Sequence, residues 1–438
     1  MAEGVAGGGA AAGAVRARVD LVVWGYPFDK SPSLQNLVRD LARVHDLRVF
    51  VDPRHARGLP GDVAIFVEAL GADSAARSVP GGAASPPTAS AEPAHPAAGV
   101  AYERGRLETW VRTRLPQRLR ALAREVYVAR EVLRGLPAFV RALRRAARPA
   151  VVVVADKTSL LAARLAGLRP AIYYSLEATP YAEETSLLYK ALNRLERRWI
   201  TRHGTWVVAQ STARAGLLQP DAARQVIVPV TSDGEPLAAS GWLRERLGLA
   251  PGQVVLLAAG GLGADQMTQE IVEASRHWDP RFVLVLHSAS GRFVPELLEL
   301  VKAPELAARV RLSTDHFTID EAERRVYAGA DIGIVYYRDL GFNHRHTAYS
   351  SGKLAAFLRA GVPVIVPDFD EFRAAVAAHG FGVCARVEEI GAAAARLLDA
   401  APAYRQAARA AFDRVYRHAP YRDRVAEVVG RLATGQGR

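Results

Sequence analysis

Short, almost wholly apolar runs alternate along the first half of the chain with segments whose apolar residues recur at helical spacing. The segment SLQNLVRDLARVHD (33–46) is one such helix, with Ser33 as its expected cap, and it joins two apolar runs. Runs that are apolar at every position are typical of strands buried on both faces, and strand, helix, strand with short connections implies a parallel sheet. The strands expected in this half lie at 18–28, 47–52, 61–70, 149–156, 170–177, 205–212 and 225–231, and Thr158 or Ser159 is the expected cap of the helix that follows 149–156.

The same alternation begins again after a break near residues 232–240. We therefore predict an α/β fold of two Rossmann-like, doubly wound parallel-sheet domains that face each other across a cleft. The domains are expected at 17–232 and 233–405, and a flexible leader at 1–16 precedes them. Helices at 406–438 are expected to cross back to the first domain.

Two stretches of the first domain depart from this alternation. Residues 72–100 are low-complexity Ala, Pro, Ser and Gly, which is typical of a disordered surface insertion. Residues 104–147 are arginine-rich with helical spacing, and Pro116 and Pro137 are expected to break this region. Such a basic region fits an anionic membrane surface, and it fits a solvated pair of helices equally well.

The composition excludes several classes of protein. Half of the 438 residues are hydrophobic, which is ample for buried cores and unlike a disordered chain. The net charge of +12 suits phosphates, nucleotides or anionic lipids, whereas the basic region lacks the interleaved aromatic residues of a nucleic-acid-binding protein. The N-terminus has no secretory signal, and no window reaches about 18 apolar residues. We expect a cytoplasmic protein, peripheral at the inner face of a membrane if it touches one, with no nucleic-acid partner.

Ligands of open α/β sheets bind beyond the carboxyl ends of the strands. This rule directs attention to the turns at 25–33, 175–180, 260–266 and 342–353.

The third of these turns is rich in glycine. Gly260, Gly261 and Gly263 lie between an apolar strand and a helix, where glycine lets the backbone approach a ligand closely. The segment is neither a GxGxxG fingerprint nor a Walker loop. A ligand contact and a plain tight turn are equally favoured here.

The segment YSSGKL (349–354) opens the helix that follows the fourth turn. Ser350, Ser351 and Gly352 are expected at the cap and first turn of this helix, where free N–H groups and the helix dipole attract a phosphate. Lys353 could add a charge-assisted hydrogen bond. Taken alone, the same residues fit an ordinary serine-capped helix better.

Other candidate polar residues lie nearby in the sequence. Asn343, His344 and Arg345 belong to GFNHRH (341–346), which we interpret as a substrate-contacting loop, since acidic or cysteine partners at metal-ligand spacing are absent from the sequence around it. Glu177 ends an apolar run and is a candidate general base or acceptor for a sugar hydroxyl, although a helix cap or an ion pair fits it as well. The single cysteine, Cys384, lies in FGVCARV and is expected to pack in a core.

The second half of the chain resembles a known family over these residues. The sequence ADIGIVYY, a polar loop and then SSGKLAAFLRAGVPVIVP is similar to the second domain of the GT-B glycosyltransferases, above all the family-4-like group. VVLLAAGGLG with EIVEA agrees with the start of that domain, and YYSLEATPY with LERRWITRHGTWVVAQST looks like part of the first. The resemblance covers nearly the whole chain except 1–16 and 72–100 and is strongest over 325–390.

The resemblance implies sugar transfer from a nucleotide-diphosphate sugar to a glycan or lipid-linked acceptor, as in bacterial envelope or exopolysaccharide synthesis. It implies a metal-independent transferase with no permanently bound cofactor, because amides, a helix dipole and basic groups neutralise the leaving diphosphate. Glu177 would be catalytic, and Tyr26 and Lys30 would join the polar loop in contacting donor sugar or acceptor. The donor diphosphate would meet Gly260, Gly261, Gly263, Ser350, Ser351, Gly352 and Lys353.

The chain departs from the family at the donor contacts. Many members carry two glutamates with seven residues between them, and these places fall on Ala348 and Ala356 here. The family's usual basic pair after the first turn of this domain is replaced by residues 264–266 (Ala-Asp-Gln). A catalytically silent GT-B partner and a GT-B sugar-nucleotide 2-epimerase are therefore the two alternatives.

Overall fold

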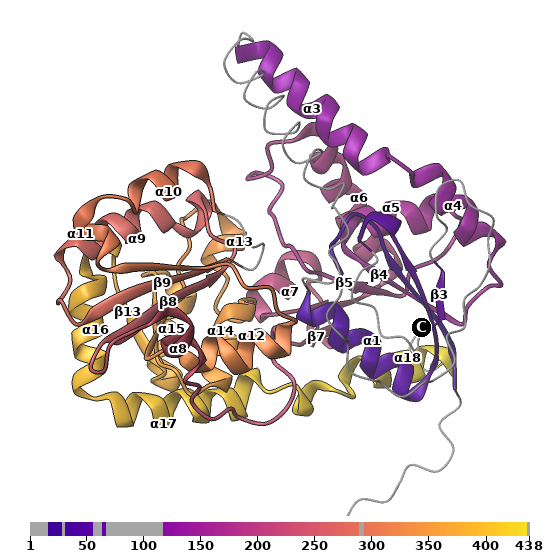
Figure 1. Cartoon of the computed structure of the whole chain (residues 1–438). Coiled ribbons are helices and arrows are strands. Elements are labelled where there is room, and N and C mark those ends of the chain that lie inside the picture. The colour runs from indigo at the N-terminus through magenta and orange to yellow at the C-terminus, as the bar shows by residue number, and fades with distance from the viewer. Residues whose placement is uncertain (1–15, 29–30, 56–63, 67–116, 289–292, 436–438) are drawn as a thin grey trace, which may run out of the picture. The chain divides into compact units, whose positions relative to one another are not determined.

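The structure is a computed structural model that describes residues 16–28, 31–55, 64–66, 117–288 and 293–435. The predicted insertion at 72–100 and nearly all of the predicted leader lie outside the described residues, as does Lys30. Two sheets of parallel strands form the framework (Figure 1), as predicted from the alternation of apolar runs and helices.

The first sheet has seven strands in the order β3-β2-β1-β4-β5-β6-β7. Central strands such as β4 are buried at every position, which explains the unbroken valines of its sequence. The strands are β1 (Arg18–Val23), β2 (Asp46–Val51), β3 (Ala64–Phe66), β4 (Val151–Ala155), β5 (Ile172–Tyr174), β6 (Trp206–Ala209) and β7 (Gln225–Ile227).

The second sheet has six strands in the order β10-β9-β8-β11-β12-β13. Its first strand in sequence, β8, lies between β9 and β11, so the chain reverses its direction of winding there, as in a Rossmann fold. The strands are β8 (Val254–Gly260), β9 (Phe282–Ser288), β10 (Val310–Ser313), β11 (Ile332–Ile334), β12 (Val364–Val366) and β13 (Gly382–Cys384). The predicted pair of doubly wound parallel sheets is confirmed.

Alternate side chains of β8 face two separate cores. Val255 and Leu257 pack with Phe357 of α14 (Gly352–Arg359), whereas Leu256 packs with Leu397 of α16 (Ile390–Asp399) on the other face. Helices thus cover both faces of the second sheet (Figure 1), and a strand in this position has to be apolar throughout.

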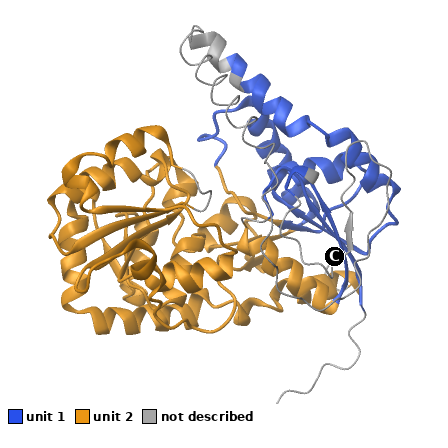
Figure 2. Cartoon of the chain, viewed as in Figure 1, with its two compact units in different colours: residues 1–29, 45–173, 180–205 blue, residues 30–44, 174–179, 206–438 orange. Residues whose placement is uncertain are grey.

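The chain divides into two compact units (Figure 2). Unit 1 consists of residues 1–29, 45–173 and 180–205, and unit 2 consists of residues 30–44, 174–179 and 206–438. Unit 2 therefore holds the whole second sheet together with β6, β7, α1 (Pro32–Val44) and α7 (Thr212–Leu218). The sequence-based boundaries at 232 and 405 stay a prediction.

The last helix returns to an early part of the chain. Helix α18 (Arg424–Ala433) packs against α1, the helix that connects β1 to β2. Just before α18, His418 Nε2 lies 2.9 Å from Asp40 Oδ2 of α1. This packing agrees with the expected return of the C-terminal helices.

Two local expectations about helix ends in unit 1 are wrong. The arginine-rich region breaks at Gly135, whose φ of +80° suits glycine, and Pro137 instead lies in the first turn of α4 (Leu136–Arg145), where its missing N–H costs no hydrogen bond. Neither Thr158 nor Ser159 caps the helix after β4, because both hydroxyls bond to the backbone of Trp24.

Candidate active site

The candidate site lies at the carboxyl ends of β8 and β11, the adjacent strands at which the second sheet reverses its winding. The chain leaves β8 at Gly260, whose φ of +94° is readily accessible only to glycine. The aliphatic stem of Lys353 lies over this glycine, since a Cβ built there would be 3.5 Å from Lys353 Cε. The structure thus brings together two of the predicted phosphate-binding segments, which are 93 residues apart from Gly260 to Lys353.

Lys353 is half-buried, and its ammonium group faces the glycine turn. Its Nζ donates to the carbonyl oxygen of Gly261 at 3.4 Å and lies 5.1 Å from the centre of the Tyr337 ring. Burial lowers the pKa of Lys353 from its ordinary value of 10.5 to about 8. An anion bound here would stabilise the ammonium form and raise that pKa again.

The first turn of α14 combines a serine cap with amides that remain available. Ser351 Oγ accepts from Leu354 N at 3.3 Å and bonds to Tyr337 Oη at 2.8 Å, so this hydroxyl is engaged within the protein. Ser350 Oγ likewise bonds to His346 O. Within the described residues, the N–H groups of Gly352 and Lys353 donate to no acceptor. These two amides are therefore available to an anion, and the diphosphate contacts assigned to the two serines stay predictions.

Glu177 and Asn343 meet within unit 2, although 166 residues separate them. The apolar run had suggested that Glu177 ends a strand. The residue instead lies in the loop after β5, and its carboxylate is exposed. Asn343 Nδ2 donates to Glu177 Oε2, while Asn343 Oδ1 accepts from Ala178 N at 3.3 Å. The asparagine thereby fixes both the loop and its carboxylate.

Arg214 supports this contact and was missed in the sequence. It belongs to α7, is almost fully buried, and donates through Nε to His346 O at 2.9 Å, through Nη2 to Asn343 O at 2.9 Å and through Nη1 to Leu176 O at 3.2 Å. One guanidinium group therefore joins the Glu177 loop to the polar loop of α13 (Phe342–Arg345). Three carbonyls from two distant segments leave no local pattern by which the sequence could have revealed this role.

A carboxylate from α15 (Asp370–His379) also reaches the site. Glu371 Oε2 accepts from Ala348 N at 3.0 Å, and its Oε1 lies 3.4 Å from His346 Nδ1. Ala348 and Ala356 are both buried, with 0% and 3% of their surface exposed. Neither position of the family's glutamate pair is therefore at the surface. Glu371 thus supplies a carboxylate beside one of the two positions where the family carries glutamate.

The remaining predicted residues lie in varied surroundings. Arg345 pairs with Asp339 at 3.0 Å, and Gly263 N donates to Thr268 Oγ1 at 2.9 Å, which ties the glycine turn to α9 (Thr268–Ala274). His344 is half-buried on α13, whereas Tyr26 belongs to unit 1. The ligand contacts assigned to all these residues stay predictions.

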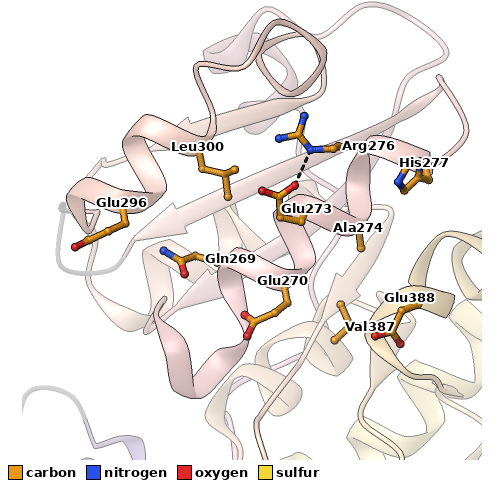
Figure 3. Close-up of a pocket in the computed structure, with 10 residues that line it drawn as sticks. All are labelled: Gln269, Glu270, Glu273, Ala274, Arg276, His277, Glu296, Leu300, Val387 and Glu388. Carbon is orange, nitrogen blue, oxygen red and sulfur yellow. Dashed lines mark hydrogen bonds and ion pairs between the residues drawn. The ribbon is translucent and has the colours of Figure 1, made fainter.

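A pocket of about 680 Å3 opens elsewhere in unit 2 (Figure 3). Its carboxylates would repel a diphosphate, and Glu273 is already paired with Arg276 at 2.6 Å. None of the predicted site residues lines it, so it is a poor candidate for the nucleotide site. The lining residues are Gln269, Glu270, Glu273, Ala274, Arg276, His277, Glu296, Leu300, Val387 and Glu388.

A reactive thiol and a metal centre are two further kinds of chemistry that a site could use. Cys384 is half-buried against a core, and burial raises the pKa of its thiol to about 11, which disfavours the nucleophilic thiolate. The part of the chain that the structure describes contains no cluster of three or more His, Cys, Asp or Glu side chains placed to hold a metal ion. In the same residues, no helix is both long enough and apolar enough to cross a membrane.

Solved structures of similar fold identify the architecture. Anabaena Alr3699/HepE in complex with UDP-glucose has 12% sequence identity and a TM-score of 0.59, and the match covers 94% of this chain and 98% of that one. The chain has the fold of the GT-B glycosyltransferases. Sucrose-phosphate synthase from Thermosynechococcus elongatus matches at 13% identity and a TM-score of 0.59, over 95% of this chain and 100% of that chain.

A third GT-B structure, the α,α-trehalose 6-phosphate synthase of Burkholderia multivorans, matches at 11% identity and a TM-score of 0.56, over 96% and 98% of the two chains. Neither a protein-family model nor a curated protein sequence matches this chain. The likeness is therefore one of fold, and it confirms the GT-B architecture expected from the sequence.

Proposed function

We propose that this protein is a glycosyltransferase that moves a sugar from a nucleotide-diphosphate donor to a glycan or lipid-linked acceptor. The observation that carries the proposal is the convergence of Gly260, the Lys353 ammonium and the unbonded amides of α14 at the switch point of the second sheet. A GT-B structure solved with UDP-glucose supports the choice of a sugar nucleotide as donor. A role in bacterial envelope or exopolysaccharide synthesis is part of the proposal.

The diphosphate would be bound without a metal ion. The Gly352 and Lys353 amides lie at the positive end of the α14 dipole, and Lys353 adds a full charge beside them. Donors arranged in this way stabilise the negative charge that develops on the leaving diphosphate. We expect activity to survive EDTA, and its loss on chelation, restored by Mg2+, would contradict this part of the proposal.

Glu177 would act on the acceptor or on the donor sugar. Its exposed carboxylate is oriented by Asn343, and Arg214 positions the backbone of both segments. A carboxylate held in this way can accept a hydrogen bond from a sugar hydroxyl or receive its proton. Glu371 and His346 lie near the same loop and would contribute to binding the donor sugar in place of the absent family glutamates.

Product analysis tests the proposal against its two alternatives. The purified chain is incubated with a panel of UDP-, GDP- and dTDP-sugars, with and without a bacterial lipid extract as acceptor, and the products are identified by mass spectrometry and NMR. A transferase releases nucleoside diphosphate and labels the extract. A 2-epimerase converts the donor without any extract, and a silent partner leaves every donor intact.

Glu177→Gln separates a catalytic contribution from simple binding. We expect the variant to keep its affinity for nucleoside diphosphate and to lose turnover by about 100-fold or more, the usual effect of a positioned acid or base. Glu183→Gln, at an exposed position a few residues further along the chain, is the matched control and is expected to keep full activity. Equal activity of the two variants would remove Glu177 from the mechanism.

A further inference from the structure

Large apolar side chains are exposed on one face of α3 (Gln117–Leu133). Leu122, Val126 and Leu133 are exposed by 60%, 60% and 49%, and their spacing of four and seven residues places them on the same side of the helix. Leu187, at the start of α6 (Leu187–His203), is 71% exposed, and its backbone is held against α3 because its N–H donates to Glu125 Oε2 at 3.0 Å. We call Leu122, Val126 and Leu133 the apolar stripe.

Other parts of α3 attach the helix to unit 1. Val132 is buried, and its carbonyl accepts from Trp24 Nε1 at 2.8 Å. Glu125 accepts from Ser186 Oγ as well as from the Leu187 amide. Helix α3 runs at the margin of unit 1 (Figure 2), so the stripe is a surface feature and not part of a core.

The sequence that carries the apolar stripe is strongly basic. Residues 117–145 contain eight arginines and two glutamates. Both glutamates are engaged, Glu125 as described and Glu131 with Arg54 at 3.6 Å. Arg130 and Arg134 are exposed at the end of α3 that carries Leu133. A partner for this surface must therefore accept apolar side chains and carry negative charge.

We propose that the apolar stripe and its neighbouring arginines form a docking surface for an anionic lipid bilayer. A helix with one apolar face and basic neighbours lies in the plane of the interface, with its apolar residues among the acyl chains and its arginines at the lipid phosphates. Nucleic acid would satisfy the arginines but would leave the leucines in water. The proposal goes beyond sugar transfer and does not depend on it.

Co-sedimentation of the full chain with vesicles tests this surface directly. Vesicles of phosphatidylcholine alone are compared with vesicles that also contain phosphatidylglycerol, for the wild type and for a variant with Leu122→Ser and Val126→Ser. The matched control carries Val294→Ser and Leu298→Ser, which are exposed by 42% and 38% and are also four residues apart. Serine leaves the net charge unchanged, so only apolar area differs.

We expect the wild type to bind the anionic vesicles at least about tenfold more tightly than the neutral ones. The stripe variant should lose about tenfold or more in affinity, while the control variant binds like the wild type. Replacing Arg130 and Arg134 by glutamine should remove the preference for anionic lipid.

The proposal is overturned if the wild type binds neither kind of vesicle, or if the stripe and control variants bind alike.

Other occupants of the stripe would give other results, each of which also overturns the proposal. If the stripe binds a second copy of the chain, the molar mass in solution would fall in the stripe variant and vesicles would not be bound. If it is covered by residues 67–116 of this chain, their deletion would create vesicle binding that the wild type lacks. A single-stranded RNA bound equally by wild type and stripe variant, without vesicle binding, would indicate a nucleic-acid surface. Thermal unfolding of each variant checks that it is folded, and nucleotide binding, measured separately, keeps the proposed function independent of this test.

Discussion

Lys353 joins the two turns of the candidate site because its stem lies over Gly260 while its ammonium approaches the Gly261 carbonyl. Burial opposes the charged form and lowers the pKa of this lysine to about 8. A bound diphosphate favours the charged form, so the two effects act in opposite directions on the same proton. The titration of Lys353 is therefore a direct report on ligand binding.

Binding of a nucleoside diphosphate should take up protons near pH 8. With a pKa of about 8, neutral and charged Lys353 coexist in the free protein near that pH, and binding raises the pKa and protonates the neutral form. Affinity should fall as the pH rises from about 7 to about 10. Above the pKa of the free protein, protonation of Lys353 costs free energy, and this cost reduces the net free energy of binding. Calorimetry in two buffers of different ionisation enthalpy measures the uptake.

The control for that experiment is Lys353→Met, which should bind more weakly and take up no proton at this site. Lys302→Met, at a lysine that is 67% exposed and paired with Glu299, should behave like the wild type. Proton uptake of the same size in the Lys353→Met variant would show that another group titrates.

Arg214 should be important for stability as well as for the shape of the site. Arg214→Lys has a single amino group and cannot bond all three carbonyls that the guanidinium group bonds. His346 O and Asn343 O keep hydroxyl donors, from Ser350 and Thr347, whereas the carbonyl of buried Leu176 would lose its arginine donor at a cost of about 1–3 kcal/mol. Urea unfolding should show a lower free energy of unfolding by that amount. Arg324→Lys, at an exposed arginine, should leave the midpoint unchanged, and an equal effect of both variants would contradict the role of Arg214.

At the scale of elements, apolar runs were sufficient to locate the strands. Both faces of each sheet are covered, so consecutive residues of a strand are buried and therefore apolar. Helix ends were harder to predict. Thr158 and Ser159 had the composition of a cap, yet tertiary bonds to Trp24 use their hydroxyls. Pro137 had the composition of a break, yet Gly135 makes it two residues earlier. In the first case tertiary hydrogen bonds, and in the second a backbone dihedral angle, determined where the helix begins or ends. Neither can be inferred from residue types alone.

The close packing of α14 on β11 gives an element-scale prediction. A Cβ at Gly333 would lie 2.7 Å from ring atoms of Phe357, so Gly333→Ala should destabilise the protein by about 1–3 kcal/mol through overpacking. Gly216, on an exposed turn of α7, has nothing within 4 Å of such a Cβ. Gly216→Ala should stabilise by about 0.5–1 kcal/mol through helix propensity. Urea midpoints compare the two, and a tolerated Gly333→Ala would refute the close approach.

At the scale of the whole molecule, the order of elements was sufficient to predict two doubly wound parallel-sheet domains, and the resemblance over 325–390 implied the GT-B architecture. The site was only partly predictable. Gly260, Gly352 and Lys353 stand in local patterns that can be read, a glycine turn and a helix start. Arg214 and Glu371 act on segments more than 20 residues away, Arg214 on backbone carbonyls and Glu371 on a backbone amide and a histidine side chain. Such contacts depend on the fold and have no signature in the adjacent sequence.

The central claim is that the α14 helix start and the glycine turn bind a nucleoside diphosphate. Isothermal titration calorimetry of the full chain with UDP, GDP, ADP and dTDP tests it most directly, with Lys353→Met and Lys302→Met as the paired variants. We predict saturable binding of at least one of these nucleotides, weakened about tenfold or more in Lys353→Met and unchanged in Lys302→Met. Absence of binding for all four nucleotides, or equal affinity of the two variants, would contradict the account.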